Sequence, residues 1–446
     1  MNIQIIKTNS LFHIWLWLFI YVLSTSIFIQ FVVLPYIFPS FHAGDGLLKG
    51  GDWIYFQKLA VDLAQKIKTQ GWSAWELRPS GQAPAGIAGA IYALTVPKPW
   101  TLIPLNAALH ATASLILLLI ISQFTDNRRI ALLSILPFVF FPSAMTWFTQ
   151  IHKDGYFILG ALLFIHGWLT FLRIIQEKVR WSEVVQGIFF IYVGVIFVWI
   201  VRPYGVQMLQ GLDLGVTMVM SIVFIVHFAK KGMHFKRLII SLLIVWMVLI
   251  TITPFTRGVV DYEMPLLPQG WLKSSWVPDF IENKIYSLSQ VREGFRKGYP
   301  EAGSNIDTDI SFHSVGDIIR YIPRALEIVL FAPFPKDWFG EGVSQWNTVM
   351  RRISGFEMTV VYISLGFLFF FIAFYMRNMQ MWVAIFFAVG MMLVYGLAIT
   401  NVGSLYRVRY GFLMILVAFG WAGFGIFWQK VHGKPAGEKN VELLRR

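Results

Sequence analysis

Charged side chains that could do chemistry occur in four short stretches, each of which adjoins a long apolar segment. The stretches are Gly50 to Ala60 with Asp52, His152-Lys153-Asp154-Gly155, Arg202-Pro203-Tyr204 and Tyr406-Arg407-Val408-Arg409-Tyr410. A carboxylate can remove a proton from an attacking hydroxyl group or hold a divalent cation. Arg and Lys bind phosphate and stabilise it as a leaving group. Together these side chains would suit group transfer from a phosphorylated lipid.

Each stretch also has an interpretation without chemistry. Asp52 could simply begin a helix, where the helix dipole favours an acid, and Lys153-Asp154-Gly155 is an ordinary turn sequence. Arg202 and the basic and aromatic group at 406–410 could be interface anchors. Anchoring alone seldom explains why four separate segment ends all carry charge. Asp45, in the stretch HAGDG, is a second candidate acid beside Asp52.

The composition indicates a membrane protein. Of the 446 residues, 57% are hydrophobic and 14% are charged, and the mean hydropathy is +0.62. A soluble domain has about 25% charged residues. The absence of cysteine excludes disulfides, thiolate metal ligands and a catalytic thiol. The formal charge of +13 suggests contact with anionic lipid headgroups rather than nucleic acid.

Ten apolar stretches of spanning length predict an all-α, polytopic transmembrane fold. They cover residues 12–36, 101–122, 130–149, 156–173, 184–201, 206–228, 237–254, 357–376, 380–399 and 410–428. If the N-terminus is cytoplasmic, the short cytoplasmic loops and the C-terminal tail are all basic, as the positive-inside rule requires. We therefore expect an integral protein of the bacterial inner membrane with both termini in the cytoplasm and the charged stretches at the periplasmic face.

This topology divides the chain into an N-terminal transmembrane module (1–254), an outer loop region (255–356) and C-terminal helices with a tail (357–446). Long loops in a compact protein are usually functional, so we expect the chemistry in the two outer segments, 38–100 and 255–356. In the first, the apolar spacing predicts an amphipathic helix from Asp52 to Trp72 along the outer membrane surface. The Pro- and Gly-rich stretch from Arg78 to Pro99 favours an irregular connection.

The order of these features resembles the GT-C superfamily of polytopic glycosyltransferases, which includes protein O-mannosyltransferases and bacterial aminoarabinose transferases. The resemblance rests on an acid with aromatic and small residues in the first outer loop, an acid opening the fourth span, an Arg-Pro pair after the fifth and a basic, aromatic stretch before the last. These features are Asp52, Tyr55 and Ala60; Lys153-Asp154; Arg202-Pro203; and Tyr406 to Tyr410. Many members carry two adjacent acids where this chain has Gly51-Asp52-Trp53, which leaves open whether Asp45 or Asp52 is the principal acid.

The resemblance implies a GT-C-like architecture and an inverting transfer of a sugar from a polyprenyl-phosphate donor to a glycan, lipid or protein acceptor. Asp52, or Asp45, would be the base on the acceptor hydroxyl group. Asp154 would be a supporting acid that orients the site or helps to hold a divalent metal cation. The donor phosphate would be bound by Lys153, Arg202, Arg324, Tyr406, Arg407 and Arg409.

Two other functions stay open at this point. A polymerase or ligase of polyprenyl-pyrophosphate-linked glycans would also combine many spans with a large outer loop, and it would depend mainly on outer-loop arginines such as Arg324. A flippase or transporter of lipid-linked sugars would need charges in mid-span and broken helices in matching halves. Neither is evident, although Pro104, Pro137 and Pro142 interrupt apolar runs.

Overall fold

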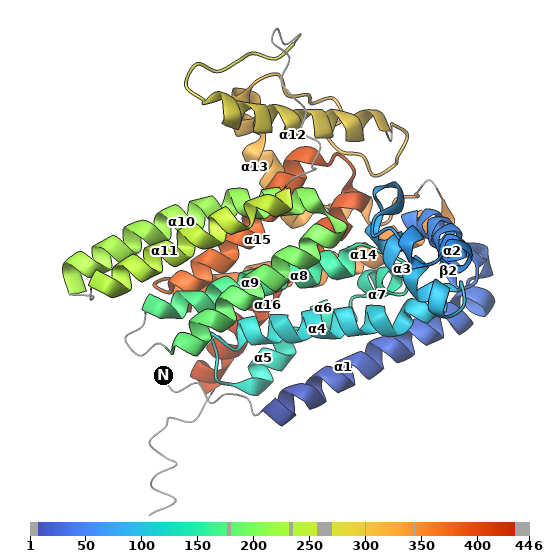
Figure 1. Ribbon diagram of the computed structural model, residues 1–446, viewed down its shortest axis with the longest axis horizontal. Coiled ribbons are helices and arrows are strands. Elements are labelled where there is room, and N and C mark those ends of the chain that lie inside the picture. Colours follow the sequence, from blue (N-terminus) through green and yellow to red (C-terminus); the bar gives the residue numbers. More distant parts are fainter. Residues whose placement is uncertain are drawn as a thin grey trace, which may run out of the picture.

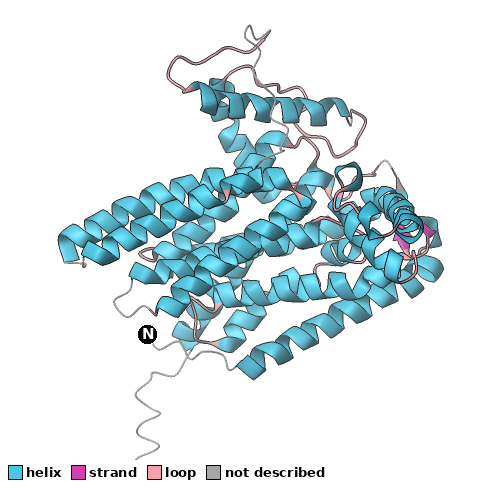
Figure 2. Cartoon of the chain, in the orientation of Figure 1, coloured by secondary structure: helices cyan, strands magenta, loops and turns pink. Residues whose placement is uncertain are grey.

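The computed structural model describes residues 8–175, 180–231, 235–256, 270–298, 300–342 and 344–432, and almost all of their regular structure is helical (Figure 2). The described strands form one antiparallel hairpin of β1 (His42–Gly44) and β2 (Leu47–Leu48). Apart from this hairpin, the described residues confirm the expected α-helical fold class.

Nine of the described helices are long and apolar enough to cross a membrane, as expected of an integral membrane protein. They are α1 (Thr8–Phe28) with its continuation Ile29–Ile37, α4 (Ile103–Ile121), α8 (Asp154–Phe171), α9 (Trp181–Val201), α10 (Pro203–Lys231), α11 (Phe235–Thr251), α14 (Gln345–Tyr375), α15 (Met379–Ala398) and α16 (Val402–His432). They correspond to nine of the ten predicted spans.

The predicted span at 130–149 is different, because the structure divides it into three short helices. These are α5 (Arg128–Ser134), α6 (Leu136–Phe140) and α7 (Pro142–Phe148). The expectation of one continuous helix is wrong at this point. Pro137 and Pro142 lack the N–H group for a helical hydrogen bond, and their rings clash with the preceding turn.

The three short helices nevertheless follow α16 along its length. Near the end of α16, Asn127 Nδ2 donates a hydrogen bond to Gln429 Oε1 at 3.2 Å. Near its beginning, the ring of Trp147 packs edge-on against that of Tyr406, with 6.2 Å between the centroids. The chain therefore passes from one end of the bundle to the other in three pieces.

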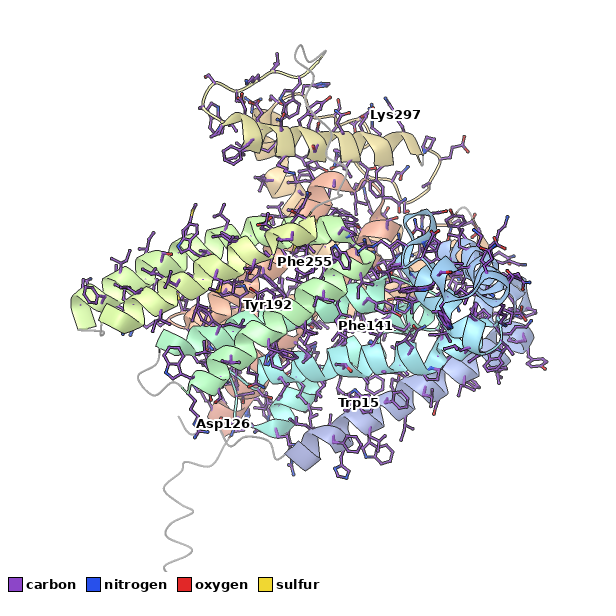
Figure 3. The ribbon with its side chains drawn as sticks, viewed as in Figure 1. Trp15, Asp126, Phe141, Tyr192, Phe255 and Lys297 are labelled. Atoms are coloured by element: carbon purple, nitrogen blue, oxygen red, sulfur yellow. The ribbon has the colours of Figure 1, made fainter. Side chains whose placement is uncertain are left out.

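One end of the bundle brings together the beginnings of α8 and α16 and the end of α9, and we call it the site end. Beside it, α2 (Asp52–Gln70) and α3 (Ala83–Leu94) pack together next to the hairpin (Figure 1). On another side, α12 (Asp279–Gly298) and α13 (Val315–Phe331) pack against α15. Asp126 lies at the end of the bundle opposite the site end (Figure 3). Lys297 lies on α12, outside the bundle (Figure 3).

The first outer loop confirms one prediction and overturns another. The amphipathic helix expected from Asp52 is α2, and it buries Phe56, Leu63 and Ile67. The stretch from Arg78 to Pro99 is not simply irregular, because α3 occupies its centre. Small residues allow α3 to lie close to α2: a Cβ atom on Gly89 would come within 2.9 Å of Leu63 Cδ2. Sequence reasoning treated these glycines as helix breakers, whereas they serve packing.

Glycines also fix how α8 lies against α9. A Cβ atom on Gly160 would come within 2.7 Å of the carbonyl oxygen of Gly194, and one on Gly167 within 2.6 Å of that of Gly187. The two contacts are seven residues apart on each helix, so the antiparallel backbones approach closely over two turns. This packing sets the beginning of α8 beside the end of α9, where Asp154 and Arg202 lie.

Candidate functional site

Four of the predicted residues form a continuous chain of opposite charges at the site end. Asp154 Oδ1 lies 2.6 Å from Arg202 Nη2, and Asp154 Oδ2 lies 3.2 Å from Arg407 Nε. Arg407 Nη2 lies 3.1 Å from Asp52 Oδ2. The residues belong to α2, α8, the α9–α10 junction and α16, so the fold unites positions up to 355 apart in sequence.

Burial divides this chain of charges into an inner and an outer part. The side chains of Asp154 and Arg202 are 4% and 5% exposed, whereas those of Asp52 and Arg407 are 56% and 25% exposed. A buried ion pair needs nearly ideal partners, because its groups have lost the solvation of water. The buried pair of Asp154 and Arg202 therefore holds Arg407 in place, and the carboxylate of Asp52 stays accessible from the cavity.

Lys153 adds a second cation beside the exposed acid. Its ammonium group lies 5.4 Å from the centroid of the Phe56 ring on α2. Burial lowers the pKa of Lys153, and the charge of Arg202 lowers it further, while Asp52 and Asp154 act in the other direction. An anion such as phosphate would favour the protonated form and would therefore be bound in that form.

These side chains face a cavity of about 2290 Å³. Its walls include six of the predicted residues: Asp52, Lys153, Arg202, Arg324, Tyr406 and Arg407. Asp154 is buried behind the wall. The cavity also reaches α10, α11 and α12, so it is much longer than the cluster of charges.

Arg324 lines the cavity from α13 and is already paired. Its Nε and Nη2 atoms donate to the two oxygens of Asp307 at 2.9 and 3.1 Å, and Nη1 donates to Glu327 at 2.9 Å. Partial burial would raise the pKa of Asp307, but hydrogen bonds from Arg324 and Tyr321 outweigh it and lower that pKa. Arg324 therefore offers a ligand less free charge than Lys153 does.

Besides Asp154, two more predicted residues lie away from the cavity wall. Arg409 is fully buried, and its guanidinium group donates to the carbonyl oxygens of Ile328 (2.9 Å) and Val329 (2.6 Å) and to that of Ala332. It thereby satisfies the carboxyl end of α13, a position that favours a cation. Asp45 lies in the hairpin turn, where its carboxylate is half exposed and pairs with Lys98 Nζ at 2.7 Å. Of the two candidate acids, Asp52 lines the cavity and Asp45 does not.

Sequence reasoning missed Glu357, which lies behind the wall of the cavity. It is fully buried on α14, and its carboxylate accepts hydrogen bonds from the backbone and side chain of Ser143 and from the hydroxyl group of Tyr406. A signal was present, because Glu357 is the only charged residue from 353 to 376. A lone acid inside an apolar span normally has a function or a partner.

The described residues do not group into a ready set of ligands for the expected divalent cation. Within the part of the chain that the structure describes, no group of three or more His, Cys, Asp or Glu residues is placed to hold a metal ion. A cation between Asp52 and Asp154 would meet the positive charges of Arg202 and Arg407. These two acids therefore do not fit a protein-held cation, and the metal stays a prediction of the family resemblance.

A comparison of the chain with protein-family models, with curated proteins and with solved structures finds no match. The functional interpretation therefore depends on the chemistry and geometry of the site.

Proposed function

We propose that this protein is an inverting glycosyltransferase with a GT-C-like architecture. It would transfer a sugar from a polyprenyl-phosphate donor to an acceptor hydroxyl group. The observation that carries the proposal is the exposed carboxylate of Asp52 in a membrane-end cavity, with Arg407 and Lys153 beside it. One side chain can act as a base and its neighbours bind phosphate.

In the reaction, the carboxylate of Asp52 accepts the proton of the acceptor hydroxyl group while the acceptor oxygen attacks the anomeric carbon of the sugar. The bond between that carbon and the phosphate oxygen breaks, and its electron pair stays on polyprenyl phosphate. Lys153 and Arg407 stabilise the negative charge that develops on this leaving group. Asp154 and Arg202 act indirectly, because they fix the position of Arg407.

The part of the cavity that α10, α11 and α12 line supports a donor with a long apolar chain. One face of α12 turns apolar side chains into the cavity: Phe280, Ile281, Ile285, Leu288 and Val291. Lys284 and Ser287 of the same helix also line the cavity, whereas Glu282 and Arg292 are buried against the protein. Leu214 on α10 and Ile250 on α11 also line the cavity. Apolar surface facing an open cavity is stabilised when an apolar ligand covers it, as a polyprenyl chain would.

Charge at the end of the bundle opposite the site supports a site on the extracytoplasmic face, which would be periplasmic in the proposed bacterial inner membrane. Basic residues flank the helix ends opposite the site, including Arg128, Arg129, Arg173, Arg377 and Lys430. The positive-inside rule favours this end, and with it both termini, on the cytoplasmic side.

The test is to incubate the purified protein with decaprenyl-phosphoryl sugars labelled in the sugar, together with membrane extract as the source of acceptor. The proposal predicts transfer of label and release of an equal amount of decaprenyl phosphate. A polymerase or ligase would leave these donors intact and would lose activity on Arg324→Ala. A flippase would move the intact lipid across vesicles without releasing decaprenyl phosphate. Either result would contradict the proposal.

A further inference from the structure

The buried carboxylate of Glu357 controls what two cavity-lining residues can offer a ligand. Glu357 Oε1 accepts from the backbone N–H of Ser143 at 2.7 Å. Glu357 Oε2 accepts from the Ser143 hydroxyl group and from the Tyr406 hydroxyl group, both at 2.6 Å. Three donors thus converge on one carboxylate, and Ser143 and Tyr406 also line the cavity.

The three donors also indicate the state of this carboxylate. Hydrogen bonds from N–H and O–H groups stabilise its negative charge, so they suit the ionised form of Glu357. An ionised carboxylate only accepts hydrogen bonds.

The single hydroxyl hydrogen of Tyr406 is therefore committed to Glu357. A phenol has one hydrogen to donate, and a phosphate group can only be bound by donors. Tyr406 can still offer the cavity its oxygen lone pairs and its aromatic ring. This differs from the sequence prediction that Tyr406 binds the donor phosphate, a task for which Lys153 and Arg407 supply donors.

Trp147 completes this part of the wall. It lines the cavity next to Tyr406, with the two rings at 77° and their centroids 6.2 Å apart. Two aromatic rings beside an acceptor oxygen suit the apolar C–H face of a sugar ring and its hydroxyl groups.

We infer that Trp147 and Tyr406 form a sugar corner, which binds the uncharged sugar of the donor, while Lys153 and Arg407 bind its phosphate. In the sugar corner, Tyr406 accepts a hydrogen bond from a sugar hydroxyl group, and Glu357 is a positioning residue that keeps the phenol in this role. The inference rests on the proposed function, since it divides the two parts of the proposed donor between two parts of one cavity.

Binding of two probes tests this division. The first is decaprenyl phosphate, and the second is a set of decaprenyl-phosphoryl mannose, glucose, galactose and arabinose, with dissociation constants measured by calorimetry on the full-length protein in detergent. Tyr406→Phe keeps the ring and removes only the hydroxyl group. It should raise the dissociation constant of the sugar-bearing lipid that binds best by about three- to tenfold, the worth of one hydrogen bond. The value for decaprenyl phosphate should stay within about twofold.

Lys153→Met is the matched control and should weaken both probes. Glu357→Gln is a second test, because its amide can donate to the Tyr406 oxygen and release the phenol hydrogen towards the cavity. It should reduce the preference for the sugar-bearing lipid while leaving Tyr406 in place. Equal weakening of both probes by Tyr406→Phe, or no change in either, would overturn the sugar corner alone. Failure of the wild-type protein to bind either probe would overturn the proposed function and this inference with it.

Discussion

The charge chain at the site end shows how each residue depends on its neighbours. Asp154 has a carboxylate oxygen for each of two arginines, and only one of these arginines continues to Asp52. The buried pair therefore sets the geometry of the exposed pair. Changes in the buried pair should appear mainly as loss of stability, whereas changes in Asp52 should appear as loss of activity.

Arg202→Met should destabilise the fold by about 3 kcal/mol, because it leaves Asp154 buried with one partner fewer. The double variant Asp154→Asn with Arg202→Met should recover part of that loss, since it removes the uncompensated charge as well. Thermal unfolding of the purified variants in detergent measures both values. Equal melting temperatures for the wild type and Arg202→Met would show that the pair does not stabilise the fold.

If Lys153 binds the donor phosphate as proposed, donor binding should depend on pH. Since burial and Arg202 lower its pKa below that of an ordinary lysine, its charge is present at low pH and is lost as pH rises through the lowered value. The affinity for decaprenyl phosphate should therefore fall at a pH below about 10.4, the ordinary lysine value. Lys153→Arg should remove this fall, because arginine stays charged. Identical pH profiles for both proteins would exclude Lys153 as a phosphate ligand.

Most of the charged site could be predicted because its residues lie at the ends of apolar stretches, where a charge needs a partner or a ligand. Arg409 shows the limit of that reasoning. It lies two positions after Arg407 on the same helix and so faces another direction, towards the end of α13. Which of two nearby arginines faces a cavity depends on the helices around them, and sequence spacing alone does not reveal it.

At the scale of elements, small residues determine how closely the helices approach. A Cβ atom on Gly420 of α16 would lie 1.9 Å from the carbonyl oxygen of Ser364 on α14. Real Cβ atoms do not come so close to backbone, so this crossing requires glycine.

Gly420→Ala should lower the melting temperature strongly, because α14 and α16 must move apart. The matched control is Gly366→Ala on α14, where a Cβ atom meets nothing within 4 Å. That change should be neutral or slightly stabilising, since alanine is the better helix former by about 1 kcal/mol. Similar melting temperatures for the two variants would refute a tight α14–α16 crossing.

The short helices α5 to α7 and helix α3 could not be predicted from the local sequence. Pro137 and Pro142 were visible, but an apolar stretch with prolines can remain one kinked helix or divide into several. The glycines of α3 gave the opposite error, because the packing of Gly89 against α2 and of Gly86 against the backbone of Glu76 and Leu77 became evident only in the structure. Hydropathy located the long helices well, since spanning length is a strong local signal.

The proposed function of the whole molecule requires that the site end and the opposite end of the bundle face opposite sides of the membrane. The absence of cysteine makes this easy to test with single-cysteine variants. Lys66 is exposed on α2 near the site end, and Arg377 is exposed at the opposite end. The two variants are therefore Lys66→Cys and Arg377→Cys. In intact bacterial cells with a permeable outer membrane, a membrane-impermeant maleimide should label the first at once and the second only after lysis. The reverse pattern would place the site in the cytoplasm.

The proposed role of Asp52 as the base of a sugar-transfer reaction is tested by the rate at which purified variants transfer sugar from a labelled decaprenyl-phosphoryl donor. Asp52→Asn should reduce the rate by about 100-fold or more, the usual worth of a general base. Asp45→Asn, which alters only the exposed pair with Lys98, should keep the wild-type rate. A wild-type rate for Asp52→Asn at a normal melting temperature would contradict the claim.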